Sequence, residues 1–301
     1  MTVHRSHNTP RNQLVLSTTL KRQLARKVYP VHRLDHRTSG AILFAFDSST
    51  CANLHKALTL GQSTIINGTM IEKSKKEYLA LLRGDWKRKF GDQEEIVVDK
   101  PLDVKGVSKE ARTVFKLLAS YSGNEYKSQD ITDSSFVSSA CSLVLCSPET
   151  GRTHQIRRHA NALGFPVIGD SAHGDSKVNR WWRENRKLNR LFLHCLNLDL
   201  PPLNAMRTVV ENEIADTQSD ELIIDPNEAT KIQSKTKPFY SNDRIQCTAP
   251  IPEELSSIFS KHEDLSTLWN SAKQKEKRLN LSPVDDRGGT YGRNYRSRIS
   301  K

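Results

Sequence analysis

The chain has 301 residues, a formal net charge of +12 at neutral pH and an isoelectric point of about 9.5. This length fits one large domain or two ordinary ones, and the charge favours a polyanionic partner, with nucleic acid ahead of an anionic membrane surface. No apolar run approaches the ~20 residues that a membrane-spanning helix needs. The five cysteines form no CxxC pair, which argues against a disulfide framework and a structural zinc. We therefore expect an intracellular protein with reduced thiols, cytoplasmic by default, with an organelle or the nucleus left open.

The first 34 residues contain no Asp or Glu and seven Lys or Arg. Leu20, Leu24 and Val28 recur every four residues among these cations, which predicts a short amphipathic helix with a basic face. The loop that follows carries Asp35, the first acidic residue, between His32-Arg33 and His36-Arg37. After it come Ser39, Gly40 and the apolar run 41–46, which predicts a turn and then a buried strand.

Asp35 is the strongest candidate for chemistry in this part of the chain. A carboxylate among four basic side chains stays ionised, because nearby positive charge favours the charged form. An ionised carboxylate on a loop held by a rigid strand suits a nucleophile. It equally suits a capping Asp in a surface loop that pairs with a neighbouring Arg. The residues of this stretch leave both interpretations open.

Further along, the patterns predict helices at 54–60, after a Ser48-Ser49 cap, and at 153–161, capped by Thr153 and stopped by Gly164. Residues 85–110 read as a loop or hairpin and residues 120–139 as a surface loop. Strands are predicted at 78–82, 111–119, 141–147, 165–168 and 191–200. Strands outnumber helices and do not alternate with them regularly. This favours an α+β fold, with a mixed, mainly antiparallel sheet and helices to one side.

The last third of the chain changes in character. Residues 207–245 are acidic and polar, which predicts an insertion or loop after a first domain at 1–206. Residues 246–280 are expected to complete that domain with a helix over 252–277, whose apolar residues recur at helical spacing. Residues 281–301 form a basic Gly/Arg/Tyr tail that we expect to be disordered, either in contact with RNA or simply solvated.

Four segments together resemble the RluA-type pseudouridine synthases. HRLDHRTSG (32–40) is similar to the first motif of the family and KKEYLALLRG (75–84) to the second. The third motif is resembled by PETGRTHQIRRHANALGFPVIGD (148–170), and the closing strand by RLFLHCLNLDL (190–200). The third motif runs on as GDSAHGDSKVNR, which is most similar to the family branch that modifies uridine 65 of tRNA. The start is similar only from Val3 onward, so we expect the N-terminal strand of the fold to be missing.

The resemblance implies a curved mixed sheet with flanking helices, no metal or organic cofactor, and three catalytic residues. Asp35 would be the nucleophile. Tyr78 would give the flipped uracil a ring to stack on, whereas the strand alone predicts a core Tyr. Arg157 would pair with Asp35 through charge-assisted hydrogen bonds, whereas the helix alone predicts an exposed Arg.

Other residues are candidates for RNA contact. His154, Arg157, Arg158 and Asn161 recur at i, i+3, i+4 and i+7, which predicts one basic helix face toward phosphates. Arg33 matches the position that wedges into the base stack beside the target. His173 and His194 stand isolated in the sequence and read as a loop and a strand residue rather than zinc ligands. Trp181 and Trp182 read equally as core or as RNA-stacking residues.

These observations predict an RNA pseudouridine synthase acting on a uridine of RNA, with tRNA ahead of rRNA. We expect a monomer without a membrane or an obligate protein partner. The alternative is an RNA-binding protein, such as a tRNA chaperone, that has lost catalysis, because the charge of +12 suits it as well. A hydrolytic glycosylase ranks third, since no second acid is placed to activate a water.

Overall fold

The computed structural model describes residue 3 and the ranges 14–59, 63–66, 69–127, 136–202 and 244–280. The start of the expected family likeness at 3–6 lies almost wholly outside these residues, as do positions 207–243 of the expected insertion and the whole basic tail. Within the described ranges, no helix is long and apolar enough to cross a membrane.

The described helices are α1 (Leu16–Gln23), α2 (Ser48–Thr59), α3 (Trp86–Phe90), α4 (Gln155–Ala162), α5 (Ser176–Arg186), α7 (Glu253–Ser260), α8 (Glu263–Lys275) and the 3-10 turn η2 (Lys277–Asn280). The long strands are β6 (Lys75–Arg83), β7 (Glu95–Asp99), β10 (Arg112–Tyr121), β13 (Cys141–Pro148), β14 (Leu193–Leu200) and β15 (Ile245–Thr248). Short strands are β1 (Tyr29–Pro30), β2 (Ser39–Gly40), β3 (Phe44–Ala45), β4 (Thr64–Ile66), β5 (Thr69–Ile71), β8 (Leu102–Val104), β9 (Val107–Lys109), β11 (Glu125–Lys127) and β12 (Phe136–Ser138).

The chain forms two compact units. The first comprises Met1–Arg33, Ile42–Lys75 and Leu198–Cys247, and the second comprises Leu34–Ala41, Lys76–Asn197 and Thr248–Lys301. Asp35, Tyr78 and Arg157 all belong to the second unit, which therefore holds every predicted catalytic residue.

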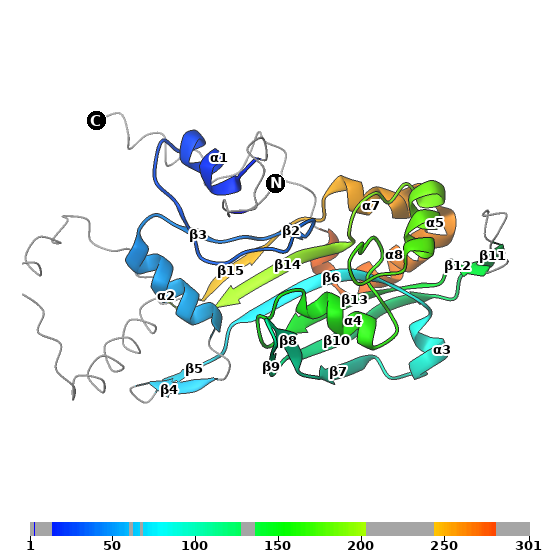
Figure 1. Ribbon diagram of the computed structural model, residues 1–301, viewed down its shortest axis with the longest axis horizontal. Coiled ribbons are helices and arrows are strands. Elements are labelled where there is room, and N and C mark those ends of the chain that lie inside the picture. The colour runs from blue at the N-terminus through cyan, green and yellow to red at the C-terminus, as the bar shows by residue number, and fades with distance from the viewer. Residues whose placement is uncertain are drawn as a thin grey trace, which may run out of the picture. The chain divides into compact units, whose positions relative to one another are not determined.

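The main sheet has the order β15-β14-β6-β13-β10-β7, with β2 added beside β14 (Figure 1). The β6–β13, β13–β10 and β10–β7 pairs are antiparallel, while β2 pairs with β14 in parallel. The predicted α+β fold with a mainly antiparallel sheet is therefore confirmed. Residues 141–147 were expected as a strand and form β13, and the strand expected at 78–82 is the centre of a longer β6.

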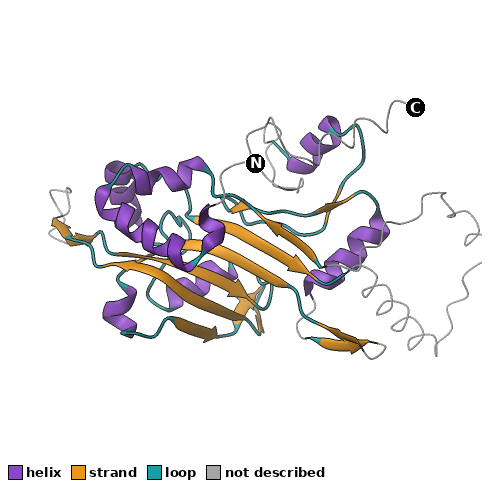
Figure 2. Cartoon of the chain, turned by 180° about the vertical axis from the view of Figure 1, so that it is seen from behind, coloured by secondary structure: helices purple, strands orange, loops and turns teal. Residues whose placement is uncertain are grey.

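Both faces of this sheet are covered, and the sequence of β6 shows why. Leu79 and Leu81 belong to one core cluster, together with Trp182 of α5 and the apolar residues of α7 and α8. Ala80 and Leu82 belong to the other cluster, on the face that carries α3 and α4. α4 lies in front of the strands in Figure 1, and the helices of the other face lie in front of them in Figure 2. A strand that is buried on both faces has a continuous apolar sequence, as β6 does. The expectation that helices cover one side of the sheet only was therefore wrong.

Trp181 and Trp182 are both accounted for by the first cluster. Trp182 is 1% exposed and Trp181 is partly buried against the same residues. Their helix α5 was not predicted from the sequence. Its buried positions, Val178 and Trp182, stand among many Lys and Arg residues, which obscure the apolar periodicity. Its N-cap is Asp175, whose side chain accepts hydrogen bonds from the backbone N–H groups of Lys177 and Val178.

Several local predictions were wrong for physical reasons. The run 41–46 is not one strand: within it only Phe44–Ala45 is a strand, which pairs with β1, and Ser39–Gly40, just before the run, pairs with β14. The loop expected at 120–139 contains the paired strands β11 and β12. The 252–277 helix is interrupted at Lys261 and His262, and the expected insertion ends in β15. The helix at 153–161 begins at Gln155, with His154 rather than Thr153 at its N-cap.

The joint between β2 and β14 requires glycine at position 40. Gly40 has φ +114°, and a Cβ placed there would lie 2.2 Å from the backbone oxygen of Cys195. The backbones of Gly40 and Cys195 are held this close by the next residue, because the Ala41 N–H donates to the same Cys195 oxygen at 2.9 Å. The loop that carries Asp35 is thereby fixed to the main sheet.

We expect Gly40→Ala to lower the free energy of unfolding by roughly 1–3 kcal/mol from backbone strain alone. Urea unfolding followed by circular dichroism measures the change. Gly151→Ala is the matched control, because Gly151 has no positive φ and a Cβ added there would meet no atom within 4 Å. Equal stability of the two variants would contradict this account of the joint.

Candidate active site

The loop that carries Asp35 is a turn closed by its own backbone. Thr38 N–H donates to the Asp35 carbonyl at 2.9 Å, and Arg37 within the turn has φ 70°. Asp35 is half-buried, and its carboxylate accepts no hydrogen bond from the described residues. Such a carboxylate keeps its oxygen lone pairs available, which a nucleophile requires.

His194 of β14 holds the next strand of the loop through Ser39. Its Nε2 lies 3.2 Å from the carbonyl oxygen of Ala249 and must donate to it, because a carbonyl only accepts. Burial lowers the pKa of His194, which favours the neutral ring. Its Nδ1 then accepts from the hydroxyl of Ser39 at 3.0 Å. His194 is therefore a strand residue, as predicted, and its hydrogen bond to Ser39 helps to hold β2 against β14.

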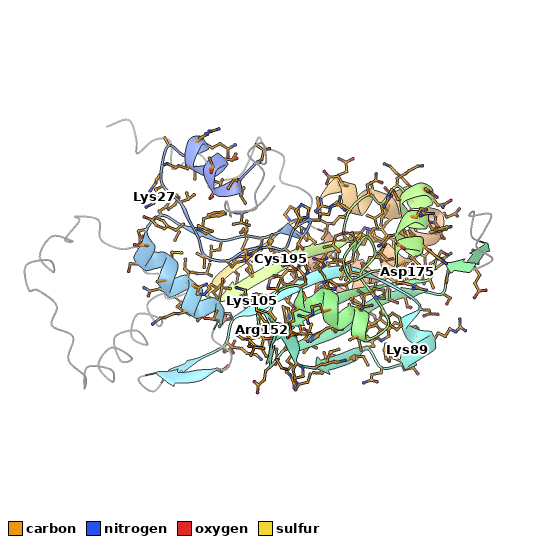
Figure 3. All side chains as sticks on the ribbon, in the orientation of Figure 1. Lys27, Lys89, Lys105, Arg152, Asp175 and Cys195 are labelled. Atoms are coloured by element: carbon orange, nitrogen blue, oxygen red, sulfur yellow. The ribbon has the colours of Figure 1, made fainter. Side chains whose placement is uncertain are left out.

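Tyr78 lies on β6, where it packs partly buried against the core cluster that carries α4. Its pKa is raised well above the usual value, first by burial, then by Cys195, to whose sulfur the phenol hydrogen-bonds, and by the charge of Asp35. The phenol is thus neutral and within electrostatic reach of the predicted nucleophile. Cys195 is labelled on β14 in Figure 3 and belongs to the strand that fixes the Asp35 loop.

Lys76 is a site residue that the sequence analysis overlooked. It lies two residues before Tyr78 on the same strand, so both side chains point to the same face of the sheet. Burial lowers its pKa, and interaction with Cys195 partly opposes that shift. The period of two along β6 is the signal that would have identified it.

α4 is fixed to the sheet by two residues of the third motif. The side-chain amide of Gln155 donates to the Arg112 carbonyl at 2.9 Å and to the Thr113 hydroxyl at 3.0 Å. The His159 ring bridges Thr113 and the Lys100 carbonyl, at 2.9 and 3.0 Å. Neither residue was among the predicted site residues, yet together they set the orientation of α4.

Arg157 points from α4 into the protein. Its Nε and Nη2 donate to the two carboxylate oxygens of Asp170 at 2.7 and 2.6 Å, and the side chains are 6% and 0% exposed. Burial alone would raise the pKa of Asp170, but these bonds and the backbone N–H groups of His173 and Ala172 outweigh it and lower that pKa. Asp170 is the last residue of the third motif, and only this position in the motif marked it as a possible site residue in the sequence.

This geometry corrects two expectations about Arg157. Among the described residues its ion pair is with Asp170 and not with Asp35, since Nε and Nη2 both donate to the Asp170 carboxylate. It is also buried, so it does not share one exposed face with Arg158 and Asn161. Nη1 is the guanidinium nitrogen that remains without a partner in the described part of the chain.

His154 and His173 form a pair and are not isolated residues. The Nδ1 of His154 lies 2.9 Å from the Nε2 of His173, and the ring planes stand at 77°. Burial lowers the pKa of both rings. Next in size, the Asp35 carboxylate raises the pKa of His154, which places this ring within electrostatic reach of Asp35.

Two of the remaining predicted RNA contacts, Arg158 and Asn161, lie on α4. Arg158 donates to the backbone oxygen of Asp103 at 2.8 Å, and Asn161 is exposed. Arg33 is exposed and belongs to the first unit. The structure thus brings Asp35 within electrostatic reach of Tyr78 and His154, with Arg157 beside His154. No group of His, Cys, Asp and Glu able to hold a metal ion occurs within the described ranges.

We expect Arg157→Gln to lower the free energy of unfolding by about 3–5 kcal/mol, because it leaves the Asp170 carboxylate buried without its cation. Arg83→Gln is the control: it breaks the half-exposed pair with Asp175 and should cost about 1 kcal/mol or less. Chemical denaturation of both variants makes the comparison. Similar losses would show that the Arg157–Asp170 pair carries no special share of the stability.

The chain is similar in sequence to a well-defined group of proteins. The model of the RNA pseudouridylate synthase family matches residues 1–162. The tRNA pseudouridine synthase C of Haemophilus ducreyi is 31% identical over 221 residues, which cover 72% of this chain and 85% of that protein. The protein of the same name from Pasteurella multocida is 34% identical over 205 residues, which cover 66% and 77%.

Among solved structures, human RNA Pseudouridylate Synthase Domain Containing 1 aligns with a TM-score of 0.45 and 25% identity, over 66% of this chain and 78% of that one. The family match spans more than half of the chain and includes Asp35, Tyr78 and Arg157. The chain therefore belongs to the RNA pseudouridylate synthase family.

Proposed function

We propose that this RNA pseudouridine synthase isomerises one uridine of a tRNA, with Asp35 as its nucleophile. The observation that carries the proposal is the Asp35 carboxylate, which has no hydrogen-bond donor among the described residues and lies within electrostatic reach of Tyr78 and His154. The relatives named tRNA pseudouridine synthase C support tRNA as the substrate class. Uridine 65 stays a prediction from the motif resemblance.

The reaction needs no net addition or loss of atoms. The C1′–N1 bond of uridine breaks, a C1′–C5 bond forms, C5 loses its proton and N1 gains one. A carboxylate can serve this exchange by attacking the sugar, by attacking the base or by removing a sugar proton, and Asp35 is placed for one of these roles. The target base has to leave its stack first, and the Tyr78 ring offers a face for it.

The basic end of the first unit suits the RNA backbone. Lys21, Arg22, Arg26 and Lys27 are all exposed and line a surface pocket of about 420 Å³. Arg26 lies 4.1 Å from the Phe46 ring centroid, and Lys27 lies 4.7 Å from that of Tyr29. Cations interleaved with aromatic rings are typical of surfaces that bind single-stranded nucleic acid. The predicted amphipathic helix is present here as α1, although it ends at Gln23 and buries none of its residues.

An RNA-binding protein without catalysis is the second candidate function, since the basic charge fits it equally. Such a protein has no need for a nucleophile free of hydrogen-bond donors beside a neutral Tyr. Substitution at position 35 separates the two candidates.

We expect Asp35→Asn to slow pseudouridine formation in total tRNA by at least ~10³-fold, with RNA affinity retained, because an amide cannot act as the nucleophile. Pseudouridine-specific chemical mapping and gel-shift titration measure the two quantities. Asp92→Asn, at an exposed acid, is the control and should leave both unchanged. If the wild-type protein binds RNA tightly but forms no pseudouridine in tRNA or rRNA, the binding-only function would be favoured.

We expect the double variant Lys21→Gln/Arg22→Gln to weaken tRNA binding and to reduce the slope of log affinity against log salt by about 1.4–1.8, the share of two phosphate contacts. The rate at saturating tRNA should not change, since α1 carries none of the proposed catalytic groups. Lys261→Gln/Lys277→Gln removes two exposed cations elsewhere and serves as the control. Equal slopes in both double variants would rule out α1 as a phosphate contact.

A further inference from the structure

Lys76 is a half-buried cation beside the ring that is proposed to stack on the target base, and the proposed function gives it no role. It lies near the start of β6, where burial of the strand begins: Lys75 is exposed, while residues 79–82 are fully buried. Side chains two residues apart along a strand point to the same face, so Lys76 and Tyr78 share the face that carries α4. Their Cα atoms lie about 6.5 Å apart.

The neighbouring strand β14 places Cys195 on this same face. The Leu81 N–H donates to the Phe192 carbonyl at 3.2 Å, and both of these side chains belong to the core cluster of the other face. Tyr78 lies three residues before Leu81, and Cys195 lies three residues after Phe192. These equal steps bring Tyr78 opposite Cys195, in agreement with the hydrogen bond between the phenol and the sulfur. Lys76 interacts electrostatically with the same sulfur, so the three side chains form one cluster.

Lys76 differs from the arginines of the second unit in its lack of a counter-charge. Each buried or half-buried arginine that the structure describes in this unit donates to a carboxylate or to a backbone carbonyl: Arg83, Arg152, Arg157, Arg158, Arg186, Arg190 and Arg278. Lys76 has no hydrogen-bond or ion-pair partner within the described ranges, and burial lowers its pKa. Because desolvation of a cation is costly without a counter-charge, this position suits an anion that arrives with the substrate.

The substrate of the proposed reaction supplies such an anion. The uracil base is neutral, whereas the phosphodiesters on either side of each nucleotide carry a full negative charge. A target base that leaves its stack turns about its own backbone, so its flanking phosphates lie at the entrance of the site. When the base occupies the face of the Tyr78 ring, the adjoining position at Lys76 is left to the backbone of the same nucleotide. Phosphate contacts of this kind fix the register of RNA on a protein without reading its sequence.

We propose that Lys76 binds a phosphate that flanks the flipped uridine and thereby holds this nucleotide against the Tyr78 ring. This inference rests on the proposed function and adds a substrate contact to it. The contact is specific to the flipped nucleotide, whereas the exposed cations of α1 are available to any part of the RNA backbone.

The test combines a variant of the full chain with a neutralised phosphate in the RNA. The tRNA is assembled from synthetic pieces, with a methylphosphonate linkage directly 5′ or directly 3′ of the uridine that pseudouridine mapping identifies. We expect Lys76→Gln to raise the KM for unmodified tRNA by ~10-fold or more, because a charge-assisted hydrogen bond is lost. The rate at saturating tRNA should change much less than KM. One of the two methylphosphonates should cause a similar loss with the wild type and no further loss with Lys76→Gln.

Two further variants control for charge and for folding. Lys76→Arg keeps the charge and should retain both the affinity and the sensitivity to the neutral linkage. Lys273→Gln is the matched control: Lys273 is also half-buried without a hydrogen-bond or ion-pair partner in the described part of the chain, but it lies on α8, against the other face of the sheet. This change should leave the KM and the methylphosphonate effect as in the wild type. The urea midpoint of Lys76→Gln should equal or exceed that of the wild type, since no partner is lost.

The outcomes distinguish this contact from the proposed function. Losses from Lys76→Gln and from each methylphosphonate that simply add would overturn the phosphate contact, while pseudouridine formation by the wild type leaves the proposed function intact. A slower rate at saturating tRNA with an unchanged KM would also overturn it, because the ammonium would then act on the leaving base. A lower urea midpoint would overturn it by revealing a structural role. A wild-type protein that forms no pseudouridine in any RNA would overturn the proposed function and this contact with it.

Discussion

The buried ion pair between Arg157 and Asp170 is the interaction on which the rest of the site depends. Two buried charges lose hydration, and only good geometry and further hydrogen bonds compensate for that loss. Here the pair is bidentate, and the backbone N–H groups of Ala172 and His173 donate to the same carboxylate at 2.9 and 3.0 Å. The pair thereby links α4 to the loop at 170–173. Arg157 and His173 both donate to this one carboxylate, and His154 is joined to His173 by the 2.9 Å hydrogen bond between their rings.

The site lies where the core on one face of the sheet ends. Along β6, residues 79–82 are completely buried, while Lys76 and Tyr78, earlier on the same strand, are only half-buried. Partial burial penalises charge, which accounts for the lowered pKa of Lys76 and of both His residues and for the raised pKa of Tyr78. The same removal of water thus moves four different groups toward their neutral forms. One physical cause, and not four separate ones, therefore accounts for the directions of these pKa shifts.

The sequence predicted those parts of the fold that depend on local pattern. β13 is recognisable from the apolar run at 143–146, and Asp35 because no other acid precedes it. The contact partners of a side chain could not be predicted in this way, because residue spacing along one helix or strand does not show which other segment packs against it. Arg157 could be placed on α4, but its choice of Asp170 depends on how the chain returns after Gly169. His173 looked isolated for the same reason: its partner lies nineteen residues earlier in the chain.

The contrast between two aspartates argues for the assignment of the nucleophile. Asp170 is fully buried, and both of its oxygens are occupied by Arg157 and by backbone N–H groups. Attack by such a carboxylate would leave several buried donors unpaired, at a cost of about 1–3 kcal/mol for each. Asp35 carries no such donors within the described ranges, and its loop is fixed through the backbone of Gly40 and the hydroxyl of Ser39. The chain thus positions the loop without using the carboxylate, which supports the proposed role of Asp35 as the nucleophile, while Asp170 binds Arg157 and the loop at 170–173.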